Sequence, residues 1–256
     1  MENMHYPEVE DLKDQFFGII ENSFSADEAE RIRSAHNIAS DLHRDKLYAS
    51  VSYDLHLLEV AEGLVHVGFA SDQHADLIIA GLYHDSFEDV PEQLLQFVGS
   101  GNGSGDVSVT EALEKITKSE KVALFVQMVS NRPFPDDIEP TEENKIRFYA
   151  DNLRQKFIGD VSEQEYDPEL FGKAVALKII DTYKNTKRLH SVKSKTKRAY
   201  LRKKYTESLK VLEEAYKLHV LGNPSVADQA EELNKCLDGI ELSIGRSHVM
   251  EGYLER

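Results

Sequence analysis

The stretch His84-Asp85-Ser86-Phe87-Glu88-Asp89 carries one imidazole and three carboxylates in six residues, directly after the apolar run of residues 77–80. The apolar lead-in predicts one helix over residues 72–90. On such a helix the four ionisable side chains fall within an arc of roughly 140°, at about 100° per residue. Unpaired acidic groups beside a core-forming run are costly to bury. A divalent metal ion is the simplest group that would offset this cost.

The composition is that of a globular protein. With 256 residues and 41% hydrophobic residues, the chain can form one large helical domain or two small ones. Its net charge of -16 argues against a general nucleic-acid binder. The N-terminus has no apolar signal segment, and no apolar run approaches the roughly 20 residues that span a bilayer. The single cysteine, Cys236, excludes an intramolecular disulfide. We therefore expect a cytoplasmic protein with no membrane partner.

Helical periodicity runs through most of the chain. The segment Ser25-Ala26-Asp27-Glu28 is a capping box with Phe24 as its staple, and it predicts a helix from Ala26 to about His43. Strand alternation and fixed-period repeats are absent, so the sequence predicts an all-α chain with residues 1–256 in a single domain. Further helices are expected over residues 9–21, 53–67, 72–90, 91–98, 110–130, 141–157, 168–189, 195–220 and 225–238. The Gly99–Gly105 segment is expected to be a flexible loop, and residues 245–256 to fray.

A metal at His84 and Asp85 needs further ligands. Imidazole and carboxylate together suit manganese, iron, zinc or magnesium. His56 lies on an apolar helix face upstream, and Asp181 follows the stretch 175–180, which is apolar except for Lys178. A carboxylate in such a place is normally avoided unless it is used. From the residues alone this ligand set is one interpretation, because a histidine such as His56 is more often a packed core residue.

Three segments together resemble the HD-domain metal-dependent phosphohydrolases. Closest are the hydrolase domain of the RelA/SpoT proteins and the small alarmone hydrolases. His84–Asp89 fits the HDxxED signature, Tyr53–Ala61 resembles the Tyr-x-x-His segment, and Leu177–Asn185 resembles the Lys-Leu-Ala-Asp-x-x-x-Asn segment. The resemblance covers about residues 26–190. It implies an HD-domain helical bundle, with residues 191–256 as extra C-terminal helices.

The resemblance also implies roles for six side chains. Glu88 and Asp89 would position and deprotonate the attacking water. Without the other segments these two residues would be read as a solvated helix end before Pro91. The ligands of the metal, usually manganese in this branch, would be His56, His84, Asp85 and Asp181.

Residues 184–204 contain ten basic side chains and no acidic one. A polyanionic substrate would be drawn to such a segment and its phosphates neutralised there. The family's asparagine and a following basic residue line its pocket, and beyond Lys193 a solvated basic helix is the better interpretation. Substrate contacts are therefore expected from Lys184, Asn185, Lys187 and Arg188.

A second substrate contact is expected near residues 44–53. Arg44 and Lys46 stand roughly where the family has an Arg-Lys pair that holds the guanine base, and Tyr48 or Tyr53 would add stacking. This stretch lacks the family's usual Gly-containing turn, and the residues between the presumed aspartate ligand and the asparagine also differ. These departures affect the identity of the substrate more than the metal site.

The leading expectation is a manganese-dependent guanosine-3′,5′-bis(diphosphate) 3′-pyrophosphohydrolase, an enzyme of the stringent response that degrades the alarmones ppGpp and pppGpp. Its partner would be a small-molecule nucleotide, and the sequence leaves a homo-oligomer open. One alternative is an HD phosphohydrolase that acts on another nucleotide. Another is a catalytically silent nucleotide-sensing module. A structural helical scaffold would leave the four presumed ligands far apart.

Overall fold

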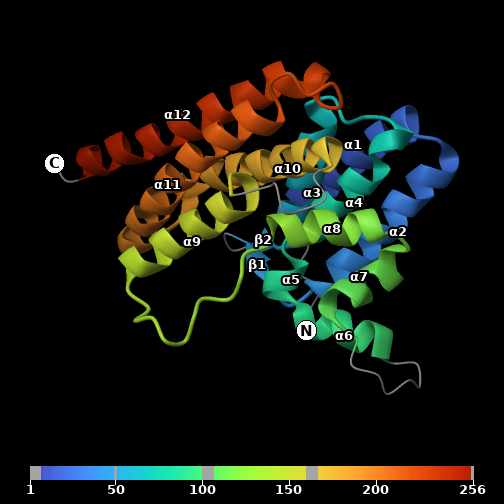
Figure 1. Ribbon diagram of the computed structural model, residues 1–256, viewed down its shortest axis with the longest axis horizontal. Helices are drawn as coiled ribbons and strands as arrows, with labels where there is room; N and C mark the ends of the chain where they lie inside the picture. Colours follow the sequence, from blue (N-terminus) through green and yellow to red (C-terminus); the bar gives the residue numbers. More distant parts are fainter. Residues whose placement is uncertain (1–6, 49–50, 100–106, 160–166, 255–256) are drawn as a thin grey trace. The chain divides into compact units, whose positions relative to one another are not determined.

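The computed structural model describes residues 7–48, 51–99, 107–159 and 167–254, with side chains up to residue 247 (Figure 1). Helices dominate these residues, and the predicted all-α class is confirmed. Strand within the described part is confined to a short antiparallel hairpin. The chain divides into two compact units, residues 1–130 (unit 1) and 131–256 (unit 2), and each is described by itself.

Unit 1 is organised around the buried helix α4 (Ala75–Tyr83). Every residue of α4 except the half-exposed Asp76 is buried, as expected for a helix that is apolar all round. It packs against α2, α3 and α8. The other elements of unit 1 are α1 (Pro7–Ser23), α2 (Ala26–Leu42), β1 (Leu47–Tyr48), β2 (Val51–Ser52), α3 (Asp54–His66), η1 (Asp72–His74), α5 (Ser86–Asp89), α6 (Pro91–Gly99), α7 (Val109–Thr117) and α8 (Glu120–Val129).

The start of α2 follows the predicted capping box. Ser25 is the N-cap, and its hydroxyl accepts a hydrogen bond from the Glu28 N–H at 3.5 Å. Phe24 is buried, as the staple position requires. The predicted helices that correspond to α1, α2, α3 and α6 are confirmed to within about three residues at each end.

The prediction of one continuous helix over residues 72–90 is wrong. After the 3₁₀ turn η1, α4 ends at Tyr83, and α5 starts only at Ser86. The His84 imidazole donates through Nδ1 to the Gly81 carbonyl at 2.8 Å, at the point where the helix stops. The interruption therefore falls on the imidazole and the first carboxylate of the stretch, and its ionisable side chains do not share one helical face.

The predicted helix over residues 110–130 is also two helices. Lys118 has a φ of 55°, in the left-handed region, and closes α7. Ser119 then caps α8 by accepting a hydrogen bond from the Val122 N–H at 3.3 Å. A serine N-cap satisfies a backbone N–H that the start of a helix leaves free, so the polar pair interrupts an otherwise apolar helical pattern.

Unit 2 is built on the buried helix α10 (Pro168–Lys187). Residues 171–182 of this helix are all buried. Helix α10 packs against α11 and α12, and α9 packs against α11. Thr141 caps α9 and Asp167 caps α10, and both helices begin within one residue of the predicted starts. The other elements of unit 2 are α9 (Glu142–Phe157), η3 (Leu189–Ser191), α11 (Lys195–His219), η4 (Ala227–Gln229) and α12 (Ala230–Leu254).

The end of the chain differs from the prediction. Helix α12 continues to Leu254, so neither the predicted end at residue 238 nor the fraying from residue 245 is found in the described backbone. The predicted flexible loop starts at Gly99, the last residue of α6, and its remainder lies outside the described residues. Within the described ranges, no helix combines the length and the apolar character needed to cross a bilayer.

Charge is distributed unevenly between the two units. Unit 1 contains 8 Lys and Arg residues against 24 Asp and Glu residues, whereas unit 2 contains 22 of each kind. The whole formal net charge of -16 therefore belongs to unit 1.

Gly172 permits a close approach between α10 and the turn after α11. A Cβ at this position would lie 2.9 Å from the His219 carbonyl oxygen and 2.7 Å from Asn223 Nδ2. That amide already donates to Pro168 O at 2.7 Å and to His219 O at 2.8 Å, so it has little freedom to move. We expect Gly172→Ala to lower the free energy of unfolding by about 1–3 kcal/mol in urea denaturation.

The matched control is Gly245→Ala in α12, where an added Cβ meets no atom within 4 Å. Alanine has the higher helix propensity, so this variant is expected to be neutral or up to about 1 kcal/mol more stable. Equal losses in the two variants would contradict the role assigned to Gly172.

Candidate metal centre

Three of the predicted metal ligands come together in unit 1. His56 lies in the first turn of α3, and His84 and Asp85 occupy the interruption between α4 and α5. The two Nε2 atoms are 3.2 Å apart. Asp85 Oδ2 lies 3.0 Å from His84 Nε2 and 3.6 Å from His56 Nε2. One ligand atom from each residue thus lies within 4.8 Å of the others, and both histidines are buried.

A main-chain contact fixes the orientation of His84. Its Nδ1 faces the Gly81 carbonyl at 2.8 Å, so the proton is assigned to Nδ1 and the Nε2 lone pair points toward His56. The Ser130 hydroxyl, just after α8, contacts the His84 carbonyl at 3.3 Å. A histidine held through its other ring nitrogen by a backbone carbonyl is prepared to bind a metal.

This donor set fits a divalent ion. A half-buried carboxylate beside two buried imidazoles leaves negative charge and lone pairs that a low-dielectric environment penalises. A cation among the three ligand atoms would satisfy all of them. Two nitrogens and one carboxylate oxygen suit borderline ions such as manganese, iron or zinc. The group of His56, His84 and Asp85 can therefore hold a divalent metal ion.

Aromatic rings pack around the imidazoles of unit 1. Tyr48 in β1 stacks on His56, with ring centroids 4.5 Å apart and planes inclined by 25°. Tyr53, which precedes α3, meets His56 edge-on at 5.7 Å and stacks on His43 at 5.1 Å and 7°. Tyr48 and Tyr53, the two residues suggested for stacking on a guanine base, thus each stack on a histidine in the structure.

Tyr53 also reaches the candidate centre through its hydroxyl, which donates to Asp85 Oδ2 at 2.5 Å. Burial, reinforced by the negative charges of Asp85 and Asp89, raises the pKa of Tyr53 far above its usual value, so the hydroxyl keeps its proton. Burial lowers the pKa of His43, whose Nδ1 lies 2.9 Å from the Ala39 carbonyl. His43 is therefore a neutral ring at pH 7.

The predicted catalytic pair follows the centre directly. The backbone N–H groups of Glu88 and Asp89 donate to the Asp85 carbonyl at 3.1 and 2.8 Å, which places both residues within one turn of a candidate ligand. The Glu88 side chain is exposed, and that of Asp89 is 33% exposed. Water can therefore reach both carboxylates, as their predicted roles require.

The two predicted base-binding residues behave differently. Lys46 Nζ lies 3.9 Å from Asp89 Oδ1, so this lysine stands beside the predicted catalytic pair. Arg44 instead pairs with Asp41 at 2.6 Å on the surface, where its side chain is 72% exposed. Of the two, Lys46 is the one that the structure brings close to the candidate centre.

Asp181, the fourth predicted ligand, belongs to α10 of unit 2 and is buried. Lys178 Nζ donates to its Oδ2 at 2.9 Å, and Asn185 Nδ2 donates to its Oδ1 at 2.6 Å. Both carboxylate oxygens are thus held by side chains about one turn before and one turn after. The metal-ligand role of Asp181 stays a prediction, because the observed cluster consists of unit 1 residues.

The predicted phosphate-binding residues lie at the end of α10. Lys184, Asn185 and Arg188 are half-exposed and Lys187 is exposed. Lys187 Nζ lies 5.4 Å from the centroid of the Tyr183 ring. These residues are accessible and lie within two turns of Asp181 on the same helix.

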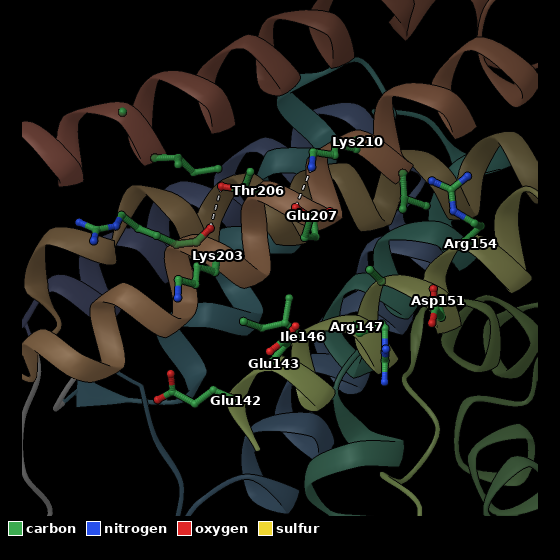
Figure 2. Close-up of a pocket in the computed structure, with 15 residues that line it drawn as sticks. Glu142, Glu143, Ile146, Arg147, Asp151, Arg154, Lys203, Thr206, Glu207 and Lys210 are labelled. Atoms are coloured by element: carbon green, nitrogen blue, oxygen red, sulfur yellow. Dashed lines mark hydrogen bonds and ion pairs between the residues drawn. The ribbon is translucent and has the colours of Figure 1, made fainter. Parts of the chain in front are cut away.

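A pocket of about 840 Å³ lies in unit 2 between α9, α11 and α12, and Figure 2 shows its lining. Five basic and four acidic side chains line it. Arg154 is already paired with Glu214 at 2.8 Å, and Lys210 with Glu207 at 2.7 Å. None of the sequence-predicted site residues is among the lining residues. Its mixed charge favours no particular ligand, and we assign it no function.

Sequence reasoning missed the contacts that Tyr53 makes with Asp85 and His43. A signal was present in the Tyr-x-x-His spacing, because the Tyr53 carbonyl accepts the His56 N–H at 2.9 Å and so starts the helix that carries this ligand. No comparable signal surrounds His43, which reaches the cluster only through the packing of α2 against the start of α3.

A scan against models of known protein families gives no match to this chain, and a search of curated proteins gives none either. The candidate metal centre therefore rests on the geometry of unit 1.

We expect the purified protein to be stabilised by divalent manganese. An ion that binds only the folded state at 100 times its Kd adds about 2.7 kcal/mol, which a thermal-unfolding titration detects. His84→Ala should abolish this shift, because it removes the ligand that contacts both of the others. The matched control is His66→Ala, an exposed histidine on α3, which should keep the shift. Retention of the full shift by His84→Ala would refute the centre.

Cys236 is buried in α12. Burial raises the pKa of its thiol to about 11. At pH 8 the reactive thiolate is then about 100-fold scarcer than for a thiol of pKa 9. We expect the native protein to react with a thiol reagent far more slowly than the urea-unfolded chain, and equal rates would contradict this burial.

Proposed function

We propose that this chain is a metal-dependent phosphohydrolase, and specifically a guanosine-3′,5′-bis(diphosphate) 3′-pyrophosphohydrolase of the cytoplasm. The observation that carries the proposal is the convergence of His56, His84 and Asp85 from separate elements of unit 1 on one point. These residues are the ones that the resemblance to HD-domain hydrolases assigns to the metal. The proposal adds to these three ligands a fourth ligand, a general base and a segment that binds phosphate.

The proposed metal is manganese, held by His56, His84 and Asp85 and completed by Asp181. Nitrogen and carboxylate ligands together match the preferences of this ion. When bound, such an ion lowers the pKa of a coordinated water and polarises a phosphoryl oxygen. The protein's own contribution is to hold the imidazoles in one tautomer, as the bond from His84 to the Gly81 carbonyl does.

Glu88 is proposed as the general base and Asp89 as the residue that orients the attacking water. The oxygen of this water forms a bond to the phosphorus that is attached to the ribose 3′ oxygen, and its proton passes to the Glu88 carboxylate. The bond between this phosphorus and the 3′ oxygen breaks, the 3′ oxygen takes up a proton from solvent and becomes the ribose 3′ hydroxyl, and pyrophosphate is released. The exposure of Glu88 supports this role, because a solvated carboxylate can pass the proton on to bulk water.

The charge distribution supports a substrate with several phosphates. In unit 2, the ten basic residues of the segment 184–204 would attract a polyanion and neutralise its phosphates. In this segment, Lys184 and Arg188 flank Asn185, which already donates to Asp181.

The test is release of pyrophosphate from ppGpp by the manganese-loaded protein. Glu88→Gln should lower kcat by about 10²- to 10⁴-fold, the usual contribution of a general base, while manganese binding is retained. The matched control is Glu92→Gln, an exposed carboxylate at the start of α6, which should leave kcat unchanged.

Other outcomes separate the alternatives. Turnover of deoxynucleotides or dinucleotide phosphates but not of ppGpp would keep the phosphohydrolase and replace the substrate. Binding of ppGpp without turnover in the wild type would favour a nucleotide-sensing module. Equal turnover in the wild type and in Asp85→Ala would end the proposal altogether.

A further inference from the structure

Tyr53 contacts two of the candidate ligands in unit 1. Its hydroxyl donates to Asp85 Oδ2 at 2.5 Å, and its ring meets His56 edge-on at 5.7 Å. The same Asp85 oxygen is the one that lies 3.0 Å from His84 Nε2. Tyr53 therefore contacts both Asp85 and His56. The Asp85 oxygen that it binds is also the one that faces the third candidate ligand, His84.

The hydrogen bond to Asp85 is of the strong kind. A hydroxyl that donates to a carboxylate forms a charge-assisted bond, typically 2.5–2.7 Å long, and such a bond fixes the acceptor in direction as well as distance. Asp85 stands at the interruption between α4 and α5, and its Oδ2 faces the imidazoles of His84 and His56 at 3.0 and 3.6 Å. The Tyr53 hydroxyl is thus a donor on the oxygen that would bind the ion, and without it this oxygen loses that fixed contact.

The Tyr53 ring is itself held by His43. The two rings are stacked, with centroids 5.1 Å apart and planes within 7° of parallel. His43 is 1% exposed, and its Nδ1 is held by the Ala39 carbonyl at 2.9 Å. A series of contacts thus runs from the end of α2 through His43 and Tyr53 to Asp85.

From these contacts we propose that Tyr53 is a positioning residue of the metal centre and that His43 holds its ring in place. The hydroxyl turns one Asp85 oxygen toward the imidazoles before an ion arrives, so the three ligand atoms are preorganised. This inference rests on the metal centre of the proposed function, and it names two residues that would tune the affinity of that centre without touching the ion.

A second buried tyrosine provides the comparison. The Tyr83 hydroxyl, in α4, is buried and has no hydrogen-bond partner among the described residues. Tyr83→Phe removes a tyrosine hydroxyl from unit 1, as Tyr53→Phe does, but it leaves the contact to Asp85 in place. Tyr53→Phe and Tyr83→Phe therefore differ in the contact to Asp85, while both keep their rings.

The experiment is calorimetric titration of manganese into the full chain, first stripped of metal by a chelator. We expect Tyr53→Phe to weaken the manganese Kd by about 10- to 100-fold, the usual cost of losing a group that orients a metal ligand. Tyr83→Phe should bind as the wild type does. The visible absorption of bound cobalt, which reports ligand geometry, should change in Tyr53→Phe and stay the same in Tyr83→Phe.

A pair of substitutions at His43 tests the ring separately. His43→Ala and His43→Phe both lose the bond to Ala39, but only His43→Phe keeps a ring for Tyr53 to stack on. We expect weaker manganese binding in His43→Ala and rescue in His43→Phe. A purely structural role would weaken both alike, and this outcome would overturn the part assigned to His43.

The outcomes also separate this inference from the proposed function. If the wild type binds manganese and Tyr53→Phe binds it equally well with the same cobalt spectrum, the positioning role is wrong and the metal centre stands. If the wild type binds no divalent ion, both fail. Equal weakening by Tyr53→Phe and Tyr83→Phe would also overturn the positioning role.

Discussion

Two buried imidazole nitrogens that face each other at 3.2 Å impose the main constraint on unit 1. If both rings are neutral with their lone pairs directed inward, the contact is repulsive, and a nearby carboxylate cannot relieve it without a proton or a cation. The surrounding structure prevents the rings from turning apart. The Gly81 carbonyl holds one ring, and Tyr48 is stacked on the other. The contact is relieved either by a proton on His56 Nε2, which then donates to His84 Nε2, or by a bound cation.

The remainder of each unit can be understood from its buried helix. Helix α4 is apolar on all sides, so packing on several neighbours fixes its position. The position of His84, directly after the helix, is fixed with it. Helix α10 is buried over residues 171–182 of unit 2 and carries Asp181, which is paired with the buried Lys178. Rigid helices of this kind hold functional side chains more accurately than loops do.

Much of the fold could be predicted from the sequence, because caps and apolar periodicity are local signals. The N-caps Ser25 and Thr141 were recognised from residue type and spacing, and they begin helices as predicted. The two helix breaks were missed for the opposite reason. At Ser119 a polar cap interrupts an apolar pattern that continues on both sides. At the end of α4 the His84 side chain donates to the Gly81 carbonyl, and apolar periodicity does not reveal such a contact.

The candidate centre was predictable in part. His84 and Asp85 stand out by their chemistry, and His56, one candidate from the residues alone and favoured by the resemblance, lies beside them in the structure. The contacts of Tyr53 and His43 could not be foreseen, since they depend on how α2, the hairpin and α3 pack in three dimensions. Periodicity reports which face of a helix is buried, but not which buried polar atom meets which.

The confinement of the negative charge to the first 130 residues has a consequence for the order of events at the centre. Such a unit collects cations in its ion atmosphere and depletes anions from it, before any specific contact forms. At the proposed centre, a metal ion would therefore arrive from a locally enriched supply, whereas the phosphorylated substrate that we propose would meet a repulsive potential that each bound cation lowers. For the proposed hydrolase, this charge distribution favours binding of the ion before the anion.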